Sequence, residues 1–261
     1  AMVTFTPPEK PIRLWQTKLH RPQLGAGLLR RPRLESQLER GLDRNLILVS
    51  APAGFGKTTL MVQWLEARGY PAAWLSLHED DTNLFTFLRY LIAAIRTLHA
   101  GACPTTWAML EALQEPPTEE LAISLVNELC DVSPDFMLVL DDFHRVKSPP
   151  VHKLVETLVE HMPPSLHLVL ATRADPPLPL ATLRAGHKMS ELRAGDLRFT
   201  PDEVNAYFEQ FVGSEADPGL LAALAQRTEG WVVGLRLAAL WLRDGGELPV
   251  PARSFGGTSR D

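Results

Sequence analysis

The sequence predicts an α/β fold in which a mostly parallel, five-stranded sheet is followed by a small all-α subdomain. Three observations support this prediction. Apolar runs of strand length alternate with helical patterns from about residue 46 to residue 192, which is typical of a parallel sheet with right-handed crossovers. A loop of small residues ending in Gly-Lys-Thr follows the first strand, and only helical patterns remain after about residue 197.

The first strand and the loop after it carry the most specific motif. Leu46–Val49 is a short apolar run, residues 51–58 read APAGFGKT, and an apolar-periodic helix continues to Leu65. A strand, a small-residue loop, Lys-Thr and a helix in this order form a P-loop, or Walker A motif. The first glycine of the usual pattern is Ala51 here, which requires only an ordinary backbone conformation. The core is therefore predicted to be a P-loop NTPase.

The chemistry of this loop suits a triphosphate. Gly54 and Gly56 can adopt positive φ, so that backbone N–H groups turn inward, and the helix start adds its free N–H groups. Lys57 supplies a charge for the β and γ phosphates, and the Thr58 hydroxyl is a candidate Mg²⁺ ligand. The residues expected to bind nucleotide here are Ala53, Gly54, Phe55, Gly56, Lys57, Thr58 and Thr59.

A buried strand that ends in two carboxylates is the second chemical signal. Residues 136–140 are apolar and run directly into Asp141 and Asp142. Paired carboxylates at the end of a buried strand suggest a nearby cation or water. We assign Asp141 to Mg²⁺, mostly through water, and Asp142 to orienting the attacking water. The alternative is a solvated Asp-Asp turn without catalytic function.

Two further predicted strands also end in polar residues. Strand 166–171 is followed by Thr172 and Arg173, and strand 72–77 by an acidic loop at 78–83. Arg173 is a candidate γ-phosphate sensor, although a plain surface arginine would fit the same spacing. Open α/β sheets bind ligands at the carboxyl ends of their strands. The groups expected at that edge are Ala53–Thr58, Glu79–Asp81, Asp141–Asp142 and Thr172–Arg173.

The pattern changes after Leu197. Thr200 and Glu203 form a capping box, with Pro201 in the first helical position. Helices are predicted at about 201–212, 217–228 and 231–243. We expect this subdomain to close over the nucleotide or to pack against the core, with residues 229–231 near the nucleotide.

The chain is expected to divide into four parts. These are an N-terminal arm at 1–27, a P-loop core at 28–196, a helical lid at 197–245 and a flexible tail or linker at 246–261. The tail is rich in Gly, Ser and Arg and has no periodicity, which is typical of a disordered end of a longer chain.

The composition limits the possible functions. The net charge of −5 argues weakly against direct DNA binding by this part of the protein. Cys103 and Cys130 are far apart in the sequence and have no partner motif, so a reducing cytoplasm is expected. Neither a membrane-spanning apolar run nor a secretory signal is apparent. None of the asparagines is followed by lysine, so the guanine-reading Asn-Lys-x-Asp motif is absent and an adenine nucleotide is favoured.

Taken together, these motifs resemble the nucleotide-binding region of MalT-like, ATP-dependent regulators of the LuxR family, which belong to the STAND class of signalling NTPases. The resemblance covers about residues 12–245 in the family's order. The matching segments are residues 17–22 (TKLHRP), 31–34 (RPRL), 49–60 (VSAPAGFGKTTL), 74–77 (WLSL), 140–144 (LDDFH), 171–173 (ATR), 197–200 (LRFT) and 228–231 (TEGW).

The resemblance implies an ATP/ADP switch. The family holds ADP in a closed resting form, and an inducer allows exchange to ATP, opening and self-association until hydrolysis resets it. The resemblance also implies that Thr17, Lys18 and Arg33 lie near the adenine. Relatives in the wider class carry a nucleotide-contacting proline where Val232 stands here. Full-length family members continue into a winged helix, a helical-repeat sensor and a DNA-binding helix-turn-helix, so this segment is expected to bind nucleotide but not specific DNA.

We therefore expect the ATP-binding switch module of a signalling NTPase, with Mg²⁺ and slow hydrolysis, from a transcription regulator. Lys57, Asp142 and Arg173 are the expected catalytic residues, and Thr58 and Asp141 the expected metal ligands. One alternative is a mechanical ATPase of the AAA+ kind, although no convincing arginine finger is present. The other alternative is a scaffold that binds nucleotide without hydrolysing it. The intact Asp141–Asp142 pair argues against this alternative.

Overall fold

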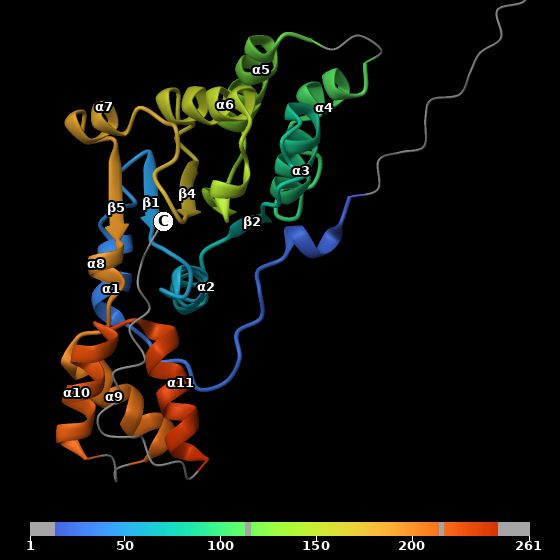
Figure 1. The fold of residues 1–261 in the computed structure, drawn as a ribbon. Coiled ribbons are helices and arrows are strands. Elements are labelled where there is room, and N and C mark those ends of the chain that lie inside the picture. Colours follow the sequence, from blue (N-terminus) through green and yellow to red (C-terminus); the bar gives the residue numbers. More distant parts are fainter. Residues whose placement is uncertain (1–13, 113–115, 214–216, 245–261) are drawn as a thin grey trace, which may run out of the picture.

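The computed structural model describes residues 14–112, 116–213 and 217–244 (Figure 1). The first part of the expected N-terminal arm and the expected tail at 246–261 lie outside the described residues. A short 3-10 helix, η1 (Gln16–Leu19), opens the described part of the chain. None of the described helices is long and apolar enough to cross a membrane.

A five-stranded parallel sheet forms the centre of the molecule, in the order β2-β3-β4-β1-β5. Every strand pairing is parallel, so the predicted α/β fold with a mostly parallel sheet is confirmed. The P-loop strand lies in the sheet interior, between β4 and β5, which places the loop beside the tip of β4. The strands are β1 (Leu46–Ser50), β2 (Ala72–Ser76), β3 (Phe136–Asp141), β4 (Leu166–Thr172) and β5 (Met189–Arg193).

Helices cover both faces of the sheet, because the strands are apolar on both sides. In β1, Leu46 and Leu48 point into one hydrophobic cluster, and Ile47 and Val49 into the other. The first cluster includes residues of α3 (Leu84–Arg96), α5 (Thr118–Cys130), α6 (Pro149–Glu160) and α7 (Leu180–Ala185). The second includes residues of α1 (Pro32–Glu39), α2 (Lys57–Arg68) and the short α8 (Ala194–Leu197).

One helix falls in a segment without a clear sequence pattern. α4 (Pro104–Leu110) lies in the region between α3 and α5. Its Trp107 ring lies 4.5 Å from the Arg96 guanidinium carbon, and the Thr106 hydroxyl donates to Glu128 at 2.7 Å. These contacts come from α3 and α5, so tertiary packing rather than local periodicity supports this short helix.

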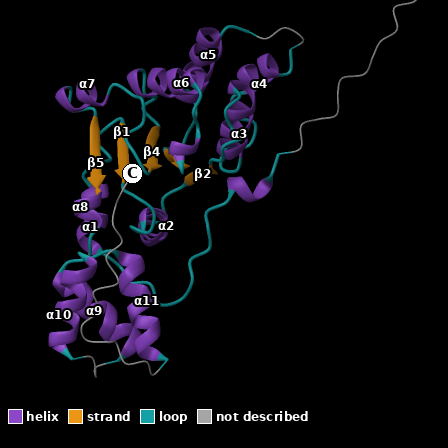
Figure 2. Cartoon of the chain, in the orientation of Figure 1, coloured by secondary structure: helices purple, strands orange, loops and turns teal. Residues whose placement is uncertain are grey.

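The C-terminal described part is a three-helix bundle that packs beside the core (Figure 2). It consists of α9 (Pro201–Val212), α10 (Pro218–Thr228) and α11 (Val232–Arg243). The predicted capping box is present, since Glu203 N–H donates to Thr200 Oγ1 at 3.2 Å and Thr200 N–H donates to Glu203 Oε2 at 3.0 Å. The bundle has its own hydrophobic cluster, which includes Phe199, Tyr207, Phe208 and Leu235.

Candidate nucleotide site

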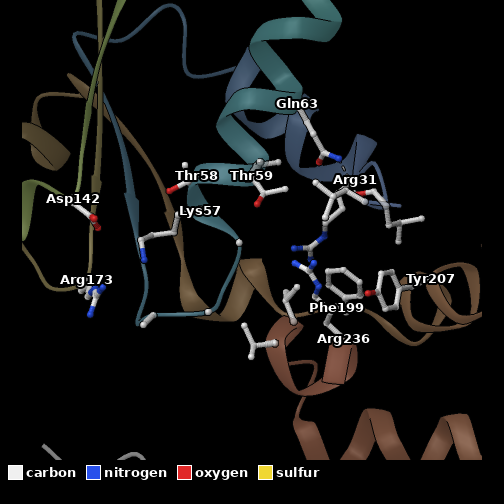
Figure 3. Close-up of a pocket in the computed structure, with 18 residues that line it drawn as sticks. Arg31, Lys57, Thr58, Thr59, Gln63, Asp142, Arg173, Phe199, Tyr207 and Arg236 are labelled. Carbon is white, nitrogen blue, oxygen red and sulfur yellow. Dashed lines mark hydrogen bonds between the residues drawn. The ribbon is translucent and has the colours of Figure 1, made fainter. Parts of the chain in front are cut away.

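A pocket of about 350 Å³ lies between the P-loop and the helical bundle (Figure 3). The P-loop and the start of α2 form one wall, and the bundle forms the opposite wall. Asp142 and Arg173 line it from the tips of β3 and β4, and Leu28 and Leu29 from the segment before α1. Segments far apart in the sequence therefore meet at the carboxyl end of the sheet, the edge at which open α/β sheets bind ligands.

The P-loop adopts the backbone conformation that its glycines permit. Gly54 has φ +79° and Gly56 has φ +77°, both in the left-handed region. A Cβ atom on Gly54 would lie 2.8 Å from the indole Nε1 of Trp231 and 2.8 Å from Val233 Cγ2. The bundle therefore contacts the phosphate-binding loop directly, and no larger residue fits at Gly54.

Lys57 is buried at the start of α2 and turned toward its own loop. Its Nζ donates to Ala51 O at 2.7 Å and to Pro52 O at 3.0 Å. Burial lowers the pKa of Lys57, while the carboxylates of Asp142 and Asp141 raise it. The loop thus holds an ammonium group at the pocket, near enough to Asp142 and Asp141 for both charges to act on it.

Thr58 and Asp141 form the oxygen pair that was expected to bind metal. The Thr58 hydroxyl donates to Asp141 Oδ2 at 3.0 Å, and the backbone N–H of Asp142 donates to Asp141 Oδ1 at 3.0 Å. Burial raises the pKa of Asp141 to about 6, aided by the charge of Asp142 and opposed by the Thr58 hydrogen bond. A hydroxyl and a carboxylate side by side are a donor set that fits Mg²⁺, which takes few protein oxygens alongside phosphates and water.

Asp142 has an unusual backbone conformation. Its φ of +57° is in the left-handed region, and it follows the last residue of β3. The carboxylate lies 3.8 Å from His144 Nδ1 and 3.5 Å from Arg145 Nε. Burial lowers the pKa of His144, and the neighbouring Arg173 charge acts in the same direction. Arg173 lines the pocket and makes no hydrogen bond or ion pair with other described residues.

The structure does not bring every predicted site residue into this pocket. Thr17 and Lys18 line a separate hollow beside β2, where Lys18 Nζ contacts the two carboxylate oxygens of Asp81 at 2.8 and 2.9 Å. The ammonium group also lies 4.6 Å from the Tyr90 ring centroid. This buried ion pair ties η1 to the loop after β2. It engages Lys18 and Asp81, one of the acidic residues expected at the ligand-binding edge of the sheet.

Two other predicted residues, Arg33 and Phe55, do not line the pocket. The Arg33 guanidinium donates to the carbonyl oxygens of Asp196 at 3.0 Å and Arg198 at 3.3 Å. Phe55 packs against the hydrophobic cluster of α1 and α2. The remaining predicted P-loop residues, Ala53, Gly54, Gly56, Lys57, Thr58 and Thr59, all line the pocket.

Several pocket residues were not predicted from the sequence, among them Arg31, Phe199, Tyr207 and Arg236. Arg31, not Arg33, lines the pocket from the Arg-Arg-Pro-Arg run, and its guanidinium donates to Leu197 O at 2.8 Å and Glu203 Oε2 at 2.9 Å. The sequence offered no signal for choosing between these arginines. The other three residues come from the bundle and its entrance, namely Phe199, Tyr207 and Arg236.

The parallel sheet, the Gly-Lys-Thr loop at the tip of an inner strand and the carboxylates at the tip of β3 define the class of protein. The fold is that of a P-loop NTPase. Among solved structures, Cdc6p from Pyrobaculum aerophilum superposes with a TM-score of 0.53 at 15% sequence identity, covering 89% of this chain and 67% of that one. At this identity the likeness concerns the fold alone.

Sequence comparison identifies closer relatives. The chain is 33% identical over 244 residues to the serine/threonine-protein kinase PknK of Mycobacterium tuberculosis, which covers 92% of this chain and 22% of the kinase. It is 33% identical over 227 residues to the HTH-type transcriptional regulator MalT of Serratia proteamaculans, covering 87% of this chain and 25% of that protein. No protein-family model matches the chain.

The resemblance to MalT-like regulators is thereby confirmed. This chain is a homologue of a region that MalT regulators share with PknK, and it spans about a quarter of the length of these relatives. The relatives combine that region with different activities, since one is named a kinase and the other a transcriptional regulator. What this region contributes is therefore best derived from its own site.

Proposed function

We propose that this chain is an ATP- and ADP-binding switch module of a signalling protein, with slow, Mg²⁺-dependent hydrolysis. The observation that carries the proposal is the position of the pocket between the P-loop and the bundle. A nucleotide bound there would contact both parts, so its phosphorylation state could change how they pack. A switch differs from an ordinary nucleotide site in this coupling.

The proposed roles follow from the geometry. The amides of residues 53–58 and the Lys57 ammonium bind the β and γ phosphates. Thr58 and Asp141 hold Mg²⁺, which would neutralise phosphate charge when bound. Asp142 orients the attacking water, and the unpaired guanidinium of Arg173 contacts the γ phosphate. These contacts supply electrostatic stabilisation and positioning, which account for most of the catalysis in phosphoryl transfer.

The relatives support the biological setting of this proposal. Because MalT is named a transcriptional regulator, we propose that the present module belongs to a regulator of transcription in the cytoplasm. We further propose that the full-length protein self-associates in its ATP state and that this module itself binds no DNA. The division into arm, core and lid is part of the same proposal, with the boundary between core and lid near residue 197, where Arg31 contacts Leu197 O.

The phosphate role of Lys57 can be tested by titration calorimetry with ATP and ADP. Lys57→Ala should weaken both affinities by at least about tenfold, because a charge-assisted contact to phosphate is lost. Lys153→Ala is a matched control, since Lys153 is exposed on α6 and pairs with Glu156. Unchanged affinity in the Lys57 variant would reject the proposed binding mode.

The switch can be separated from its alternatives by the bound molecule and the turnover rate. Protein purified gently and then denatured should release ADP. The ATPase rate of the isolated module should be slow, because a switch must remain in each state. Rapid turnover would favour a mechanical ATPase, and tight ATP binding without any turnover would favour a scaffold.

A further inference from the structure

The pocket has two chemically different ends (Figure 3). Lys57, Asp142 and Arg173 lie at the end formed by the sheet and the P-loop. The bundle end is formed by the Phe199 and Tyr207 rings together with two arginines, Arg31 and Arg236. Thr59 of α2 lies between the two ends in the same view, and Gln63 of α2 lies above Arg31.

The two arginines at the bundle end differ in how their charges are balanced. Arg31 is buried and fixed by Glu203 and by the carbonyl oxygens of Leu197 and Arg198. Arg236 lies on α11, lines the pocket and is exposed. No hydrogen bond or ion pair joins it to another residue in the described part of the chain. A guanidinium with five donors and no acceptor is therefore available at the pocket surface.

The charged residues that line the pocket also favour an anionic ligand. Arg31, Lys57, Arg173 and Arg236 all line the pocket, whereas Asp142 is the lining carboxylate among the described residues. Glu203 already balances Arg31, and no carboxylate in the described part of the chain forms an ion pair with Arg236. Cations gathered around a pocket without matching carboxylates favour an anionic ligand there.

We propose that Arg236 is a phosphate-binding residue that the helical bundle contributes to the nucleotide site, and that it contacts the α phosphate. This inference rests on the proposed function. Lys57 serves the β and γ phosphates at the far end, and the Phe199 and Tyr207 rings with Leu28 and Leu29 provide an apolar surface for the nucleoside. The α phosphate joins these two parts of a nucleotide, and Arg236 is the lining cation of the bundle end that has no ion-pair partner among the described residues.

The position of Arg236 has a consequence for the bundle. It lies one turn beyond Val232 and Val233, and the Val233 side chain already meets Gly54 of the P-loop. A phosphate held between the start of α2 and Arg236 adds a charge-assisted bridge to this apolar contact. The α phosphate is common to ATP, ADP and AMP, so this bridge distinguishes nucleotides from nucleosides and not ATP from ADP.

Competition against a fluorescent N-methylanthraniloyl derivative of ADP tests the inference. ATP, ADP, AMP and adenosine serve as competitors against the unchanged protein, Arg236→Gln, Arg236→Lys and the control Arg227→Gln. Arg227 is exposed on α10 of the same bundle and does not line the pocket. Arg236→Gln should weaken all three nucleotides by about 5- to 20-fold and adenosine by less than about twofold. Arg236→Lys should be intermediate, and Arg227→Gln should bind like the unchanged protein.

Two results would overturn the inference while leaving the proposed function intact. One is unchanged nucleotide affinity in Arg236→Gln alongside a large loss in Lys57→Ala. The other is an equal loss for adenosine and AMP, which would place the arginine against the nucleoside. If no nucleotide displaces the probe from the unchanged protein, both the proposed function and this inference fail.

Discussion

Replacing Asp141 with asparagine should stabilise the nucleotide-free protein at neutral pH while weakening its binding of Mg²⁺ and ATP. Asp141 is 5% exposed, and burial raises its pKa from 3.8 to about 6. The folded state therefore holds this proton more tightly than the unfolded chain does. The stabilising effect is complete below about pH 4 and is lost as the pH rises through about 6. At pH 7.5 the buried carboxylate is ionised, and asparagine removes that unfavourable charge.

The size of the effect follows from the shift and from the hydrogen bonds. A rise of about two pKa units corresponds to roughly 3 kcal/mol of unfavourable charge burial. Asparagine accepts through one oxygen only, so it can keep the hydrogen bond from the Thr58 hydroxyl or the one from the Asp142 N–H, not both. The lost bond costs about 1 kcal/mol. The net gain in unfolding free energy should be roughly 1 to 2 kcal/mol at pH 7.5, and at pH 4 the variant should be slightly less stable.

Urea unfolding at pH 7.5 and pH 4.0 measures this difference directly. Asp131→Asn is the control, because Asp131 is exposed at the end of α5. Calorimetry with ATP should show weaker binding to the Asp141 variant when Mg²⁺ is present and little change when EDTA is present. An equal stability difference at both pH values would refute the argument about the buried charge. Unchanged binding in Mg²⁺ would refute the metal role.

Two further substitutions test the water-orienting residue and the bundle junction. Asp142→Ala should leave nucleotide affinity within about threefold and lower ATP hydrolysis by at least about tenfold, as measured by phosphate release; undiminished turnover would show that Asp142 has no such role. Gly230 has φ +73°, and a Cβ there would lie 2.6 Å from Phe199 O. Gly230→Ala should therefore cost roughly 2 to 4 kcal/mol in urea unfolding. Gly195→Ala should be nearly neutral, since nothing lies within 4 Å, and a neutral Gly230 variant would contradict the steric argument.

Local patterns in the sequence were sufficient to predict the five strands and most of the helices. The apolar runs gave the five strands, and the capping box at Thr200 gave the start of α9. The P-loop could be found because its chemistry lies within one short segment, between a strand and a helix. α4 was missed because seven residues carry little periodicity and its support comes from α3 and α5.

The residues that line the pocket outside the P-loop and the strand tips could not be predicted from local patterns. The expectation that Thr17 and Lys18 lie near the ligand came from a family resemblance, whereas the structure pairs Lys18 with Asp81, away from the pocket. Arg31 and Arg33 are two residues apart, yet only Arg31 lines the pocket. Which arginine points inward depends on how the segment before α1 docks against the bundle.

The parallel sheet, the phosphate loop and the carboxylates at the tip of β3 could all be predicted from the sequence, because neighbouring residues encode periodicity and turn chemistry. That Phe199, Tyr207 and Arg236 line the same pocket as Lys57 became apparent only in the folded chain. The physical reason is that the bundle docks through contacts such as Trp231 and Val233 against Gly54, which join residues more than 170 positions apart. No local pattern encodes that contact, because it is set by the packing of two complete surfaces.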